Sequence, residues 1–121
     1  MAALPAAWKP KDLLVDPRDF GRPGHTGVWP ATGDPDRRAA GWQQHRVAQG
    51  VNADLASTGW TLDLLAAETG ETPDYVRSKL YGHQPASIED LMCWVRLFGA
   101  HILPPLDPAS YDELLPPAGE Q

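Results

Sequence analysis

The sequence has almost no cysteine, since Cys93 is the only one among 121 residues. A single thiol excludes an internal disulfide framework and any metal site built from several cysteines, and it is typical of a reducing compartment. Long apolar runs are also missing. No run approaches the roughly 18 residues of a membrane-spanning helix, and the N-terminus lacks the charged start and apolar segment of a signal peptide. We therefore expect a soluble cytoplasmic protein.

Positive charge is scarce as well. Sixteen Asp and Glu outnumber ten Lys and Arg, and the net charge of −6 repels phosphate at long range. Residues 104–121 hold four acidic and no basic side chains, which is two thirds of the excess. Residues 1–35 are balanced at four of each sign, and residues 36–103 hold six basic and eight acidic side chains. Any contact with nucleic acid must therefore come from a local patch.

Proline, in contrast, is abundant and unevenly distributed. Six of the 13 Pro lie in residues 1–35, too close together for a helix of ordinary length. We therefore predict an irregular arm at 1–35, a helical domain at 36–103 and a short acidic tail at 104–121. The arm also contains the apolar residues Trp8, Leu13, Leu14, Val15, Phe20 and Trp29. These apolar residues either attach the arm to the domain or dock a protein partner.

Residues 36–58 have the apolar spacing of a long helix. Val47, Val51 and Leu55 recur every four residues, and either Asp34 or Asp36 can cap the start. No proline interrupts the segment after residue 35. We expect one continuous first helix here.

Two short helices are expected next. Thr61 is a suitable N-cap for one of them, and Gly70 can end it in the left-handed conformation that glycine tolerates. Thr72 is a suitable N-cap for the other, with Pro73 at the first helical position and Gly82 at the end. Because about three residues separate the two helices, the second can project from the core, as in a helix-turn-helix.

A fourth helix is predicted between a capping box at Ser87 and Asp90 and a stop at Gly99. Its apolar face is wide enough to cover two neighbouring helices, or one neighbour and a second subunit. We find no internal repeat and no convincing strand, so the predicted fold class is an all-α bundle of four or five helices. The apolar residues of the fourth helix are Ile88, Leu91, Trp94, Val95, Leu97 and Phe98.

The segment TLDLLAAETGETPDYVRSKLYGHQPASIEDLMCWVRLFG, residues 61–99, resembles the lambda-repressor/Cro-like (Xre-type) helix-turn-helix domain. With the first helix, the resemblance covers about 65 residues. It implies a lambda-repressor-like bundle of four or five helices that binds DNA, usually as a dimer on a near-palindromic site. The positions that carry the resemblance are Thr61, Leu65, Ala66, Gly70, Thr72, Val76, Gly82, Pro85 and Leu91.

The second helix of the pair is the candidate recognition helix. Its candidate base readers are Asp74, Tyr75, Arg77 and Ser78, and Arg77 is the best suited because a guanidinium can donate two hydrogen bonds to guanine O6 and N7. Arg77 and Lys79 taken alone are also compatible with an ordinary solvated face. The candidates for contacts to the DNA backbone are Thr61, Thr72, Lys79, Tyr81, His83 and Gln84.

Other chemistry has little support in the sequence. The four histidines, at positions 25, 45, 83 and 101, lack close metal-ligand spacing and are expected to be surface or hydrogen-bonded residues. Cys93, between Met92 and Trp94, is expected to be a small core residue. No catalytic set is visible, so we expect no enzyme activity, no cofactor and no metal ion.

Two functions remain open at this point. The leading hypothesis is a cytoplasmic, homodimeric regulator of transcription that binds double-stranded DNA, with the fourth helix and the tail forming the dimer surface. The alternative is a protein-interaction module, antitoxin-like or an accessory factor, that keeps the helix-turn-helix as a scaffold and docks a partner through the arm or the tail. Net acidity and the Trp-bearing arm favour the alternative.

Overall fold

The computed structural model describes residues 8–25, 27–29 and 34–104. Within these ranges the chain forms four α-helices and no strand, which confirms the all-α fold class. Residues 105–121 of the predicted acidic tail lie outside the described residues. The helices are α1 (Pro35–Thr58), α2 (Leu62–Thr69), α3 (Pro73–Leu80) and α4 (Ile88–Phe98), with 3-10 turns η1 (Pro10–Leu13), η2 (Pro17–Asp19) and η3 (Ala100–Ile102).

The predicted caps set the helix boundaries. Asp34 Oδ1 accepts the Asp36 N–H at 2.8 Å and so starts α1. At the start of α4, Ser87 Oγ accepts the Asp90 N–H at 3.1 Å while Asp90 Oδ2 accepts the Ser87 N–H at 2.9 Å. Both ends of the capping box are therefore formed, and each satisfies an amide that the helix itself leaves unpaired.

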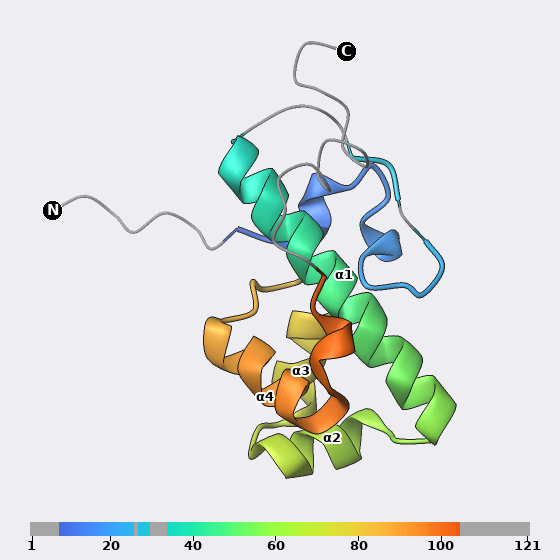
Figure 1. The fold of residues 1–121 in the computed structure, drawn as a ribbon. Helices are drawn as coiled ribbons and strands as arrows, with labels where there is room; N and C mark the ends of the chain where they lie inside the picture. Colours follow the sequence, from blue (N-terminus) through green and yellow to red (C-terminus); the bar gives the residue numbers. More distant parts are fainter. Residues whose placement is uncertain (1–7, 26, 30–33, 105–121) are drawn as a thin grey trace, which may run out of the picture.

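The long helix α1 organises the molecule. Figure 1 shows it crossing the fold diagonally, with the η1–η2 region beside its N-terminal half and α2, α3 and α4 gathered near its other end. Its apolar stripe is buried as the spacing predicts, so this one helix packs against both the η1–η2 region and the group of α2, α3 and α4. The buried hydrophobic core consists of Leu14, Phe20, Trp29, Trp42, Val47, Ala48, Val51, Leu55, Leu65, Ala66, Val76, Leu80, Trp94 and Ile102.

The arm is part of this core. Leu14, Phe20 and Trp29 are all buried, so the interpretation that apolar residues attach the arm to the domain is confirmed for them. Val15 is 65% exposed, so the interpretation is wrong for this residue. Glycine at position 41 of α1 makes the close approach possible, because a Cβ at Gly41 would overlap Leu13 Cδ1. The buried side chains of Phe20 and Trp29 are therefore not available to dock a partner.

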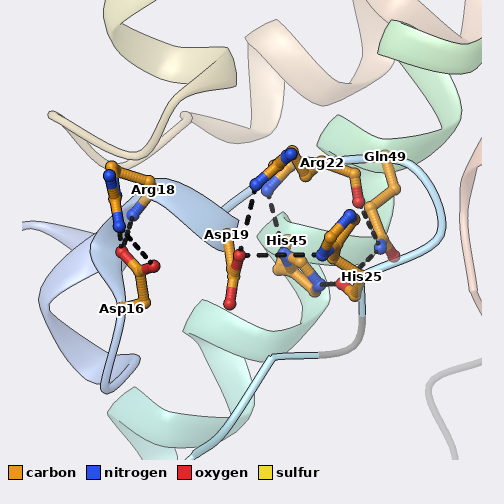
Figure 2. Close-up of polar contacts among 8 residues, drawn as sticks. Asp16, Arg18, Asp19, Arg22, His25, His45 and Gln49 are labelled. Atoms are coloured by element: carbon orange, nitrogen blue, oxygen red, sulfur yellow. Dashed lines mark hydrogen bonds and ion pairs between the residues drawn. The ribbon is translucent and has the colours of Figure 1, made fainter.

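A polar stripe on α1 fixes the loop that follows η2 (Figure 2). His45, Gln49 and Asn52 are spaced by four and three residues, so they share one face of the helix. Gln49 Nε2 donates to the carbonyls of Arg22 at 2.9 Å and His25 at 2.7 Å. Asn52 Nδ2 donates to the Gly21 carbonyl at 2.9 Å. Side chains of α1 thus satisfy backbone hydrogen-bonding groups of this irregular loop, as a neighbouring strand would do in a sheet.

His45 lies at the centre of the interface between the arm and α1. Its Nδ1 accepts the Gly21 N–H at 2.9 Å, so Nε2 carries the proton and donates to the His25 carbonyl at 2.9 Å. The rings of Phe20, Trp29 and Trp42 surround it, with centroids 5.4 to 5.6 Å away. Burial lowers the pKa of His45 to about 4 although the His25 carbonyl acts in the opposite direction. The expectation of a hydrogen-bonded histidine is confirmed.

The apolar face of α4 is only partly covered. Trp94 is buried, whereas Ile88 is 77% and Met92 49% exposed. On a helix of 3.6 residues per turn, Ile88 lies about 120° and Met92 about 160° from Trp94, which points these two away from α1. Of the two alternatives for the wide apolar face of this helix, coverage of its whole width by neighbouring helices does not hold at Ile88. Cys93, expected in the core, is half-buried, about 100° from Trp94.

Candidate nucleic-acid interface

Two short capped helices joined by a tight turn form a helix-turn-helix. The Thr61 hydroxyl accepts the Leu64 N–H at 3.2 Å, and the Thr72 hydroxyl accepts the Tyr75 N–H at 3.1 Å. Between them Gly70 has a φ of +73°, a region that residues with a Cβ rarely adopt. Both threonines are exposed, but each hydroxyl oxygen is already used as a helix cap.

The inner face of the helix-turn-helix is apolar as predicted. Leu65 and Ala66 of α2 and Val76 and Leu80 of α3 are all buried. Packing of α2 against α3 through these side chains holds the two helices as one unit. The outer face of α3 is thereby directed away from the core.

Asp74 and Arg77 are the predicted base readers that lie on this outer face. Arg77 Nη1 is 3.3 Å from Asp74 Oδ1, and the side chains are 52% and 93% exposed. Arg77 is therefore paired with Asp74 on a solvated face of α3. An exposed pair of this kind contributes only about 0–1 kcal/mol and separates easily, so the Arg77 guanidinium remains accessible to a ligand.

The other two predicted base readers are held within the molecule. The Tyr75 hydroxyl donates to Asp90 Oδ1 at 3.1 Å, and the Ser78 hydroxyl donates to the Tyr75 carbonyl at 2.9 Å. Both side chains are half-buried. Burial, together with the Asp90 carboxylate, raises the pKa of Tyr75. The contact of Tyr75 with Asp90 connects α3 to α4, whereas the Ser78 hydrogen bond lies within α3.

Lys79 does not lie on the solvent face, contrary to the expectation from the sequence. Its side chain is only 10% exposed, and Nζ donates to the Pro85 carbonyl at 2.8 Å. The ammonium is also 3.8 Å from Asp90 Oδ2 and 4.8 Å from the centre of the Tyr75 ring. The reason is local: the chain turns back after α3, and the Pro85 carbonyl faces α3 from that turn.

The remaining candidates follow α3. Tyr81, His83 and Gln84 are exposed, and the backbone N–H groups of His83 and Gln84 both donate to the Ser78 carbonyl, at 2.9 and 3.2 Å. Tyr81 and His83 lie beside the arm and line a hollow of about 270 Å³. The other residues that line this hollow are Lys11, Pro17, Arg18 and Phe20.

The arm brings cations to this place that the sequence alone did not reveal. The Lys11 N–H donates to the Gly82 carbonyl at 3.1 Å and so holds η1 against the turn after α3. Burial lowers the pKa of His83, and the positive charges of Lys11 and Lys9 lower it further. The motif Lys-Pro-Lys at 9–11 indicates positive charge in the arm, but nothing in the motif indicates which part of the domain it contacts.

The chain matches no family model, no curated protein and no solved structure. No helix in the described parts of the chain is long and apolar enough to cross a membrane. Across residues 8–25, 27–29 and 34–104, no group of three or more His, Cys, Asp or Glu side chains is arranged to hold a metal ion. Functional inference therefore depends on the geometry of this chain itself.

Proposed function

We propose that the protein binds double-stranded DNA sequence-specifically through α2 and α3, as a cytoplasmic regulator of transcription. The observation that carries this proposal is the helix-turn-helix itself: two short helices, each started by a threonine cap, with Arg77 exposed on the outer face of the second. Such a projecting helix fits the major groove, where an arginine can recognise guanine.

The proposal includes a lambda-repressor-like arrangement of the bundle. In its favour, the positions that carry the resemblance have the expected structural roles: Leu65, Ala66 and Val76 are buried, and Gly70 has a positive φ. The proposed recognition helix is α3, and α2 lies across its buried side.

We further propose a homodimer that uses the exposed side of α4. Ile88 and Met92 are one turn apart and exposed, so they offer an apolar strip that self-association would cover. Sedimentation equilibrium of the full chain and of the double variant Ile88→Ser/Met92→Ser tests this. A dimer in the wild type and a monomer in the variant are expected, and equal masses contradict the proposal.

The direct test of DNA binding is selection of bound duplexes from a random pool. For a dimeric DNA-binding protein we expect enrichment of an inverted repeat, in which the same half-site occurs twice. Arg77→Ala then reduces affinity for the selected site by about tenfold or more, since one bidentate guanine contact is worth about 1–3 kcal/mol. A pool that shows no enrichment, together with no binding at low salt, rejects the function.

A second candidate function, an antitoxin-like or accessory interaction module, is favoured by a different observation. Tyr75, Ser78 and Lys79 are engaged in contacts within the chain, so α3 offers few free polar groups to bases. The exposed Ile88 and Met92 would then be anchors for another protein. Deletion of the arm cannot separate the two functions, because Leu14, Phe20 and Trp29 are core residues.

Point variants separate them instead. Arg77→Ala is expected to reduce DNA affinity by about tenfold or more and to leave protein binding intact. Ile88→Ser/Met92→Ser is expected to remove a partner protein that co-purifies with the wild type. Both sites are at the surface, so neither variant is expected to unfold the chain. If the partner protein is lost in Arg77→Ala but retained in Ile88→Ser/Met92→Ser, the hypothesis of an interaction module that binds through α4 is contradicted.

A further inference from the structure

We infer that the hollow between the arm and the turn after α3 binds a backbone phosphate of duplex DNA, so that the arm contributes to DNA affinity beside α3. This inference rests on the proposed function and deepens it, because it assigns the phosphate contact to residues outside the helix-turn-helix. The hollow measures about 270 Å³, enough for a phosphodiester group with several water molecules.

The recognition helix itself supplies little free positive charge. Arg77 is balanced by Asp74, and the Lys79 ammonium is buried against the Pro85 carbonyl and Asp90. In a chain of net charge −6, phosphate attraction must then come from a region where cations are in local excess.

The hollow is such a region. Lys11 and Arg18 line it. Two carboxylates must be counted against these cations: Asp16 pairs with Arg18 at 3.1 Å, and Asp12 lies in the same turn as Lys11. The ammonium groups of Lys9 and Lys11 form no ion pair within 4 Å among the described residues. Asp19 also acts on Arg18 and is paired with Arg22 at 3.7 Å. With this pair included, four cations (Lys9, Lys11, Arg18, Arg22) and three carboxylates (Asp12, Asp16, Asp19) leave a net positive charge of one.

The opposite wall supplies hydrogen-bond donors. The Tyr81 hydroxyl and the His83 ring are exposed at the hollow, and neither makes a side-chain hydrogen bond within the described part of the chain. The positive charges of Lys11 and Lys9 act on His83 in the direction that lowers its pKa, and Asp12 acts more weakly in the opposite direction. Two cations on one side and two neutral donors on the other suit a phosphate oxygen.

The geometry also explains why the site is fixed in place. The Lys11 N–H to Gly82 carbonyl bond, 3.1 Å long, ties one wall to the other through backbone atoms. Substitution of the Lys11 side chain leaves this bond intact. The Gly82 turn directly follows α3, so a phosphate held here lies next to the groove that α3 would enter.

The test compares two double variants of the full chain with equal net charge. Lys9→Gln/Lys11→Gln removes Lys11, which lines the hollow, and Lys9, whose charge acts on His83. Arg46→Gln/Arg96→Gln removes two exposed cations from α1 and α4. Affinity for a duplex is measured against salt concentration. We expect the first variant to reduce the salt slope by about 1–2 and low-salt affinity by about tenfold, because each neutralised phosphate contributes about 0.9 to the slope.

The control variant is expected to leave the slope unchanged within error. Equal changes in both double variants, or none in the first, overturn the assignment of the hollow. A wild type that does not bind duplexes at any salt overturns the proposed function as well. Inorganic phosphate is titrated separately by NMR: saturable shifts at Tyr81 and His83 without any duplex binding identify a free-phosphate site and overturn the DNA assignment.

Discussion

Asp90 and Lys79 connect the start of α4 to α3 through an ion pair of 3.8 Å between two side chains that are each about one tenth exposed, 11% and 10%. The same carboxylate accepts the Tyr75 hydroxyl at 3.1 Å and caps α4 at the Ser87 N–H, 2.9 Å away. One acidic side chain therefore fixes the position of the candidate recognition helix relative to the next helix.

Replacement of Asp90 by alanine is expected to lower the free energy of unfolding by about 3–5 kcal/mol. The change leaves the Lys79 ammonium buried without its counter-charge and removes one half of the capping box. Urea unfolding at neutral pH measures it. Asp74→Ala, which breaks the exposed pair with Arg77, is the control and is expected to cost about 0–1 kcal/mol. Equal losses in the two variants contradict the structural role of Asp90.

Asp74→Asn is expected to raise affinity for duplex DNA by about threefold to tenfold. The substitution removes a negative charge that is 93% exposed on the outer face of α3 and releases the Arg77 guanidinium. One charge at about 4 Å in water is worth about 1 kcal/mol, which corresponds to this range. Fluorescence anisotropy at 50 mM and 200 mM salt measures the effect. Weaker binding in the variant means that the carboxylate itself contacts the DNA.

Acidification is expected to destabilise the fold through His45. Because its pKa falls from the ordinary 6.5 to about 4 on folding, the unfolded chain binds more protons between these values. The contribution of neutral His45 to the free energy of unfolding is fully present above pH 6.5. It is lost as the pH falls toward 4, and the loss amounts to about 3 kcal/mol. The free energy of unfolding, measured for the wild type and for His45→Gln at several pH values, isolates the contribution of His45. We expect the variant to be less stable than the wild type at pH 7.5 and to lose less stability on acidification. Parallel plots of unfolding free energy against pH for the two proteins contradict the prediction.

Two glycines with nearly the same φ are expected to respond differently to alanine. Gly70 has φ +73° and open space around a new Cβ, so Gly70→Ala costs the left-handed strain alone, about 1–2 kcal/mol. At Gly82, φ +75°, the Cβ would lie 2.8 Å from the Phe20 ring and 2.9 Å from the Lys11 nitrogen. We expect Gly82→Ala to cost about 1–3 kcal/mol more, by overpacking. Equal Tm values would show that the arm does not contact this turn.

The helix positions were predictable because their determinants are local. Thr61, Thr72 and Ser87 cap helices through atoms three residues away, and Gly70 turns the chain by its own φ. Such signals are contained in four or five consecutive residues, and tertiary packing here agrees with them. The boundaries of α2, α3 and α4 needed no knowledge of the rest of the molecule.

The placement of site residues was only partly predictable. Lys79 looked like a surface lysine by helical spacing, but the Pro85 carbonyl and Asp90, six and eleven residues later, enclose it. The partnership of Lys11 with Gly82 was equally invisible, since no pattern in an irregular arm specifies which turn it meets. Contacts of high sequence separation are decided by packing of the whole core.

The hydrogen bond from the Lys11 N–H to the Gly82 carbonyl also bears on the order in which the chain folds. Residues 8–25 and 27–29 are synthesised before α1, yet the surface they bind does not exist until α1, α3 and the turn at Gly82 have been synthesised. Docking of the arm is therefore a late, long-range step, and until then the aromatic side chains of Phe20 and Trp29 are exposed to other nascent chains. Phe20 and Trp29, which are synthesised before α1, therefore become buried only after α3 and the turn at Gly82 exist.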